Sequence, residues 1–140
     1  MEQLAVEIVG LCREYGECRV EVERMEEARR VKNALESVCV VARRKLDISD
    51  PALLLALLDA YEVTRDEGML QEVLDVVGRN LDRLAVSVES VKLLACCYYY
   101  VEEEECAERA RRMLEELRKM GRRIGGCGDN FGGIDLRFRL

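Results

Sequence analysis

The feature that most constrains the fold is the spacing of apolar residues between Asp50 and Gly121. They recur every three or four positions in four successive segments, which is the period of an amphipathic helix. The first segment runs from Pro51 to about Val63 and is apolar almost all round, so we expect neighbouring elements to cover it on several sides. Asp50 marks its start, because an aspartate can accept a hydrogen bond from a free first-turn amide and proline suits the first helical position.

The other three segments carry their own boundary signals. Thr64 and Glu67 have the spacing of a capping box at the start of the second segment. Ser87 is placed to cap the third, and Gly121 to close the fourth as a left-handed cap. Because the connections are short, the four segments predict two antiparallel helical hairpins.

The two predicted hairpins are alike at an interval of 37 residues. The residues that correspond are Leu57 with Leu94, Leu58 with Ala95, Tyr61 with Tyr98 and Leu70 with Ala107. This pattern resembles the tetratricopeptide class of helical repeat, in which a Leu, a small residue and a Tyr on the first helix pack against a small residue on the second. A later aromatic of that class is replaced by Leu74 and Arg111, and the closing proline is absent from both hairpins. The resemblance covers residues 51–121 and implies helical hairpins that stack.

The N-terminal part predicts two more helices. Apolar spacing indicates one from about Glu2 that Gly16 ends, and another from Met25 to about Leu46. Residues 17–23 between them alternate between apolar and charged side chains. That pattern is typical of a strand, but it also fits an irregular lead into the second helix.

The C-terminal end has a different character. Residues 122–133 form a Gly-rich stretch, predicted to be a flexible connector. Residues 134–140 alternate strictly, with an apolar set that we predict to bind a partner: Ile134, Leu136, Phe138 and Leu140. A strand cannot satisfy its own backbone, so this tail is expected to pair with residues 17–23 or with another chain.

These observations together predict a mostly all-α protein. We expect a bundle of about six helices in stacked antiparallel hairpins, with a small two-stranded β element from residues 17–23 and 134–140 as an option. Residues 1–121 would form a single helical domain, followed by the connector at 122–133 and the tail at 134–140. A single proline and an aliphatic core without Trp fit this class.

Charge and hydropathy restrict the location and the partners. The acidic start and the absence of a long apolar run predict no signal peptide and no membrane partner, and hence a cytoplasmic protein. A net charge of −6 argues against a dedicated nucleic-acid binder. A local basic group at Arg118, Lys119, Arg122 and Arg123 leaves a nucleic-acid-associated subunit as the third-ranked function. The excess of arginine over lysine fits a heat-adapted source or a GC-rich genome.

The seven cysteines are the unusual part of the composition. They include no CxxC pair and the chain has no histidine, which argues against a zinc or iron–sulfur site. The simpler interpretation is that they are small apolar core residues. The alternative is disulfides, for which Cys97 and Cys106 are the candidate pair because they lie at facing ends of two helices.

Paired carboxylates suggest the main alternative function. Glu72 with Asp75, and Glu102 with Glu105, are each spaced by one helical turn, which resembles the metal-binding faces of magnesium-dependent all-α nucleotide pyrophosphohydrolases. The order of the two pairs is reversed relative to that family, and exposed helix surface explains each pair. We therefore expect these carboxylates not to converge on a metal.

The favoured function is a non-enzymatic protein–protein interaction or scaffold module. Stacked helical hairpins present grooves to peptide segments, whereas no nucleophile, tuned base or oxyanion site is recognisable and no cofactor is expected. The partner would be another protein, or a second copy of the chain reached through the C-terminal tail.

Overall fold

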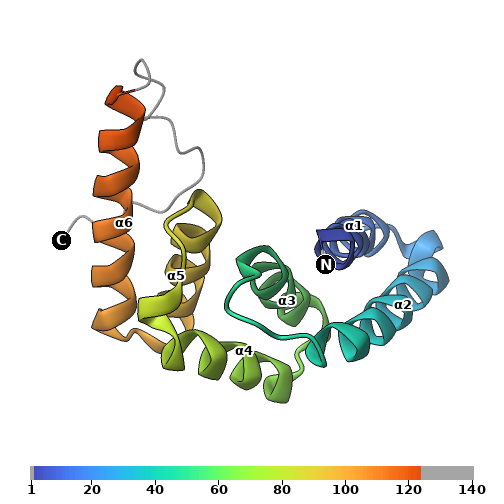
Figure 1. The fold of residues 1–140 in the computed structure, drawn as a ribbon. Coiled ribbons are helices and arrows are strands. Elements are labelled where there is room, and N and C mark those ends of the chain that lie inside the picture. Colours follow the sequence, from blue (N-terminus) through green and yellow to red (C-terminus); the bar gives the residue numbers. More distant parts are fainter. Residues whose placement is uncertain (1, 124–140) are drawn as a thin grey trace. The chain divides into compact units, whose positions relative to one another are not determined.

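The computed structural model describes residues 2–123 of the chain, and within that range the protein is all-α (Figure 1). Its elements in chain order are α1 (Glu2–Cys18), the 3₁₀ turn η1 (Val22–Arg24), α2 (Met25–Arg43), α3 (Pro51–Thr64), α4 (Glu67–Arg79), the 3₁₀ turn η2 (Leu81–Arg83), α5 (Val88–Val101) and α6 (Glu104–Arg123). The prediction of an all-α protein with six helices is confirmed for this range. The predicted connector and tail lie outside the described residues, apart from residues 122 and 123, which belong to α6.

The strand considered for residues 17–23 is not formed. Glu17 and Cys18 are the last residues of α1, and a turn then leads to η1. Cys18 is fully buried. Extending the helix past Gly16 gives this thiol a place in the core, so tertiary burial overrides both the alternation and the glycine. The prediction that Gly16 ends the first helix is therefore wrong.

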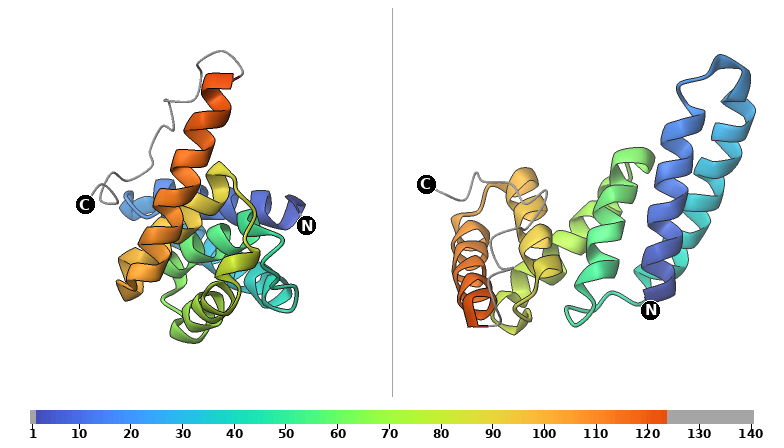
Figure 2. Two further views of the ribbon diagram at one scale, coloured as in Figure 1. Left: turned by 60° about the vertical axis from the view of Figure 1, so that its left-hand side comes forward. Right: turned by 90° about the horizontal axis from the view of Figure 1, so that it is seen from above.

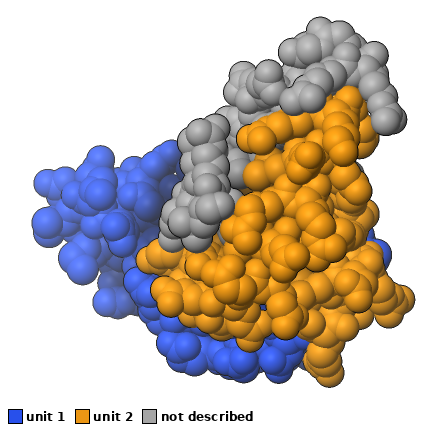
Figure 3. Space-filling view, turned by 90° about the vertical axis from the view of Figure 1, so that its left-hand side faces the viewer, with its two compact units in different colours: residues 1–76 blue, residues 77–140 orange. Residues whose placement is uncertain are grey.

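The chain divides into two compact units, residues 1–76 and residues 77–140 (Figure 3). The single helical domain over residues 1–121 stays a prediction from the sequence. In the first unit, α1 packs against both α2 and α3 (Figure 2). Ile8, Leu35 and Leu57, one from each helix, are fully buried and show where this core lies.

The second unit is built on the hairpin of α5 and α6, which pack against each other. Leu94 of α5 and Ala110 and Met113 of α6 are fully buried. The opposite side of α6 is strongly charged, so this helix shows the separation of apolar and polar faces that its sequence predicted.

The 37-residue interval is visible in the local structure. α3 and α5 begin at Pro51 and Val88 and are each 14 residues long, and α4 and α6 begin at Glu67 and Glu104. The amides of Arg65 and Glu102 close α3 and α5 by bonding the carbonyls of Tyr61 and Tyr98. Both cap residues adopt left-handed backbone, with φ of 57° and 53°. The 37-residue interval therefore holds for the starts of the four helices and for the length and C-terminal cap of α3 and α5, whereas α4 and α6 differ in length, with 13 and 20 residues.

The two predicted caps of α3 and α5 are present. Asp50 accepts a hydrogen bond from the Leu53 amide at 3.2 Å, and Ser87 accepts one from the Ser90 amide at 3.1 Å. These residues also lie 37 positions apart and so belong to the same repeat.

Two other boundary predictions are wrong. Thr64 is the last residue of α3, and α4 is capped by Asp66, whose carboxylate accepts from the Met69 amide at 3.1 Å. Gly121 lies inside α6, which continues to Arg123. A glycine costs a helix interior about 1 kcal/mol relative to alanine, a cost that one residue in a 20-residue amphipathic helix can carry.

In the part of the chain that the structure describes, no helix is both long enough and apolar enough to cross a lipid bilayer.

Candidate interaction surfaces

The connection between α1 and α2 presents a group of exposed apolar side chains. Val20, Val22 and Met25 are 74%, 82% and 59% exposed and lie within six residues of one another. Single exposed apolar residues are ordinary on protein surfaces, but several close together more often mark an interaction site. We call these three residues the apolar turn.

The apolar turn is held by buried and charged groups beside it. The Arg24 guanidinium donates two hydrogen bonds to the Glu27 carboxylate, at 2.9 and 3.0 Å, and lies 3.9 Å from a Glu21 oxygen. The hydrogen bonds from Arg24 lower the pKa of Glu27. Burial raises the pKa of the Cys18 thiol, which stays protonated and packs beneath the turn. Arg24 thus braces the turn through a bidentate pair, the stronger geometry for arginine and carboxylate.

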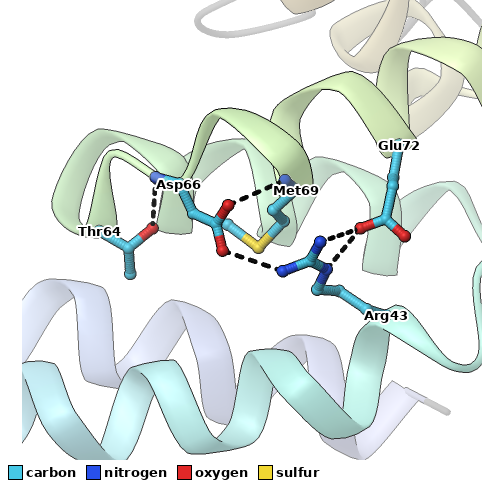
Figure 4. Close-up of polar contacts among 5 residues, drawn as sticks. All are labelled: Arg43, Thr64, Asp66, Met69 and Glu72. Carbon is cyan, nitrogen blue, oxygen red and sulfur yellow. Dashed lines mark hydrogen bonds and ion pairs between the residues drawn. The ribbon is translucent and has the colours of Figure 1, made fainter.

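A second polar cluster joins α2 to the start of α4 within the first unit (Figure 4). The Arg43 guanidinium donates to Asp66 at 2.9 Å and also binds the Glu72 carboxylate. Asp66 uses its other oxygen to cap α4 at the Met69 amide, and its own amide donates to the Thr64 hydroxyl at 3.4 Å. Arg43 therefore links the capping residue and the second turn of α4 to the end of α2.

Sequence reasoning missed this role of Arg43. Taken from the sequence alone, the run Arg43, Arg44 and Lys45 at the end of α2 indicates only cations that complement the free carbonyls of the helix end. Asp66 and Glu72 lie 23 and 29 residues further along the chain, and no local periodicity connects them to Arg43. Only packing of the helices brings the three charges together.

The four carboxylates considered for magnesium have separate surroundings. Glu72 is paired with Arg43. Glu102 forms the left-handed end of α5, and Glu105 lies in the first turn of α6, where negative charge is favourable. Asp75 is an exposed residue of α4. Among residues 2–123, no group of three acidic, cysteine or histidine side chains is arranged to hold a metal ion.

The candidate disulfide pair is found as two thiols. Cys97 on α5 and Cys106 on α6 are 1% and 2% exposed, and both are free cysteines in the structure, so the bridge considered from the sequence is not formed. Burial raises the pKa of Cys97 and raises the pKa of Cys106 to about 11. At neutral pH both are protonated, and they fill the α5–α6 interface as small apolar groups.

In the first unit, α1 and α2 carry a similar pair. Burial, with the nearby Asp59 carboxylate as a smaller cause, raises the pKa of Cys12 to about 11. Burial likewise raises the pKa of Cys39 to about 11. These surroundings are the opposite of the electropositive sites in which catalytic cysteines occur.

Two apolar side chains near the end of α5 are also exposed. Tyr99 is 60% exposed and Val101 is 40% exposed. The rings of Tyr99 and Tyr100 meet edge to face, with centroids 5.2 Å apart and planes at 80°. Four exposed glutamates follow, Glu102 and Glu103 after α5 and Glu104 and Glu105 at the start of α6.

The basic residues near the end of α6 are only partly described. Lys119 is exposed and Arg118 is half-buried. Of the four basic residues that the sequence grouped, the side chains of Arg118 and Lys119 are described, and Lys119 is the exposed one of these two.

Comparison with protein-family profiles, with curated proteins and with solved structures returned no significant match.

Proposed function

We propose that the protein is a non-enzymatic protein–protein interaction or scaffold module built from helical hairpins. The observation that supports this most directly is the apolar turn, where Val20, Val22 and Met25 stand far out of the core. Covering two valines and a methionine contributes about 3–6 kcal/mol, a gain that a partner seated on this turn would supply.

The way the turn is held supports the same proposal. Arg24 binds Glu27 through two hydrogen bonds, and Cys18 is buried directly before the turn. A surface that is ordered before binding loses less conformational entropy when a partner arrives. The expected partner therefore offers an apolar pocket or groove with polar groups at its rim, because glutamates and arginines surround the turn.

The test is site-specific photocrosslinking. A photoreactive residue at Val22 should give a defined protein adduct in cells, whereas the same residue at the exposed Ser37 of α2 should not. The captured partner is then purified without the crosslink. Its affinity for the Val20→Ser, Val22→Ser, Met25→Ser variant should be at least tenfold weaker than for the wild type, because the apolar contact is lost. Equal binding by variant and wild type contradicts the proposal.

A thermal-shift scan tests the alternative function, a magnesium-dependent phosphohydrolase. A ligand that binds only the folded state raises the melting temperature. We expect no shift with magnesium, manganese or nucleotides. Stabilisation by magnesium with a nucleotide, lost in Glu72→Gln and Asp75→Asn, would favour the phosphohydrolase instead.

A further inference from the structure

We propose that Met25 is a reversible oxidation site through which hydrogen peroxide weakens partner binding at the apolar turn. The inference rests on the proposed function, because it concerns regulation of the same turn. Met25 is the first residue of α2 and is 59% exposed. Its side chain is thus part of the surface that the partner would cover.

Burial separates the methionines whose side chains the structure describes. Met69 of α4 and Met113 of α6 are 1% and 0% exposed, whereas Met25 and Met120 are 59% and 49% exposed. An oxidant in solution has to reach the thioether sulfur, so the packed pair is shielded and the exposed pair is open to it. Of the exposed pair, Met25 belongs to the apolar turn, and Met120 lies on α6 in the other unit.

The thiol that packs beneath the turn does not compete for the oxidant. Cys18 is fully buried, and burial raises the pKa of its thiol, so it stays protonated at neutral pH. Peroxides react with the thiolate, whereas a thioether carries no proton and is oxidised without ionising. Peroxide that reaches the apolar turn therefore reacts at Met25 before it reacts at Cys18.

Oxidation changes Met25 from an apolar to a polar side chain. Hydrogen peroxide transfers one oxygen to the sulfur: an S–O bond forms, the O–O bond breaks and water leaves. The sulfur loses two electrons, which reduce the peroxide. A methionine sulfoxide reductase reverses the step with two thiols, which become a disulfide while the oxygen leaves as water.

The sulfoxide weakens binding because its oxygen would have to lose water to enter an apolar pocket. Val20 and Val22 are unchanged by the oxidation, so the loss is partial. We expect an affinity about fivefold lower, a smaller loss than in the Val20→Ser, Val22→Ser, Met25→Ser variant. The fold should be retained, because a mostly exposed side chain contributes little to the core.

Limited treatment of the full chain with hydrogen peroxide, followed by peptide mass spectrometry, tests the site. Met25 and Met120 should be oxidised about tenfold faster than Met69 and Met113. In urea the four rates should converge, because burial is then lost. Oxidation of Met25 as slowly as Met69 in the folded chain overturns the inference.

The consequence is measured in the Met120→Leu variant, with Met25→Leu, Met120→Leu as the matched control that keeps every cysteine. After peroxide, the retention of Met120→Leu on a phenyl matrix, a defined apolar probe, should fall. Its affinity for the partner captured at Val22 should drop about fivefold. Methionine sulfoxide reductase should restore both values. The control should give the same retention and the same affinity before and after peroxide.

Equal changes in Met120→Leu and in the control overturn the inference, because another residue would then be the target. Unchanged partner affinity after complete oxidation of Met25 also overturns it, and a loss of affinity in the triple serine variant would still support the proposed function. Equal binding by the triple serine variant and the wild type contradicts the proposed function, and the inference falls with it.

Discussion

At the residue scale, Arg43 shows how much depends on one side chain. Its guanidinium binds Asp66, which caps α4, and Glu72, which lies in the second turn of that helix. Both carboxylate side chains are nearly half-exposed, so solvent screens each ion pair. Arg43→Ala should lower the free energy of unfolding by about 1 kcal/mol, since an exposed pair contributes up to about 1 kcal/mol and two are lost together. Urea unfolding measures this, and the loss should shrink in 1 M salt.

The control for Arg43 is Arg29→Ala. Arg29 pairs with Glu26 within one helix at 3.2 Å, and both side chains are largely exposed. This substitution should change the free energy of unfolding by less than about 0.5 kcal/mol. An equal loss in both variants would mean that Arg43 contributes only as a helix residue.

The buried thiols predict a pH dependence. The pKa of Cys106 is about 11 in the folded chain against an ordinary value of 9.0, because burial disfavours the thiolate. The unfolded chain therefore loses this proton first as the pH rises. The stability contributed by Cys106 is fully present below about pH 9 and is lost progressively as the pH rises through 11.

Urea midpoints of the wild type and of Cys106→Ala between pH 8 and pH 11 test this dependence. The midpoint of the wild type should fall more steeply above pH 9 than that of the variant. Cys12 and Cys39, whose pKa values are also about 11, remain in both proteins and contribute equally. Parallel curves would contradict the assignment to Cys106.

At the element scale, the left-handed C-terminal caps of α3 and α5 are positions where glycine should be more stable than the native residue. Arg65 and Glu102 adopt positive φ, which costs a residue with a Cβ about 1 kcal/mol. Glu102→Gly should therefore raise the free energy of unfolding by about 0.5–1 kcal/mol. Arg65→Gly should gain less, because the Arg65 guanidinium lies 5.7 Å from the Tyr61 ring centre and that contact is lost.

Chemical unfolding of both variants checks the prediction, with Glu108→Gly as the matched control. Glu108 lies inside α6, where glycine should be destabilising by about 1 kcal/mol. A loss of stability in Glu102→Gly would mean that the glutamate side chain contributes more than the strained backbone costs.

At the scale of the whole molecule, the repeat predicts comparable cores in the two units. Leu57 of α3 and Leu94 of α5 occupy corresponding positions 37 residues apart, and both are fully buried. Leu57→Ala and Leu94→Ala should each lower the free energy of unfolding by about 2–5 kcal/mol, measured by urea unfolding of the variants. Val22→Ser, on the exposed turn, should change it by less than about 0.5 kcal/mol. A large loss in Val22→Ser would place that side chain in a core.

The sequence by itself determined the helices and most of their starts. Apolar spacing located all six, and Asp50 and Ser87 marked two starts correctly, because periodicity and capping depend on neighbours within one or two turns. The 37-residue interval could also be seen in advance, since equivalent positions carry similar side chains.

Tertiary packing decided the rest. Because Cys18 is buried, α1 continues past Gly16. The alternating residues 17–23 are therefore not a strand, and they contribute Val20 and Val22 to the exposed apolar turn. Packing also brought Arg43 to Asp66 and Glu72 and made Asp66, not Thr64, the cap of α4. These contacts join residues far apart in the chain or compete with a local signal of similar strength. Which of these contacts forms depends on which residues the folded core buries, and local sequence patterns do not determine that.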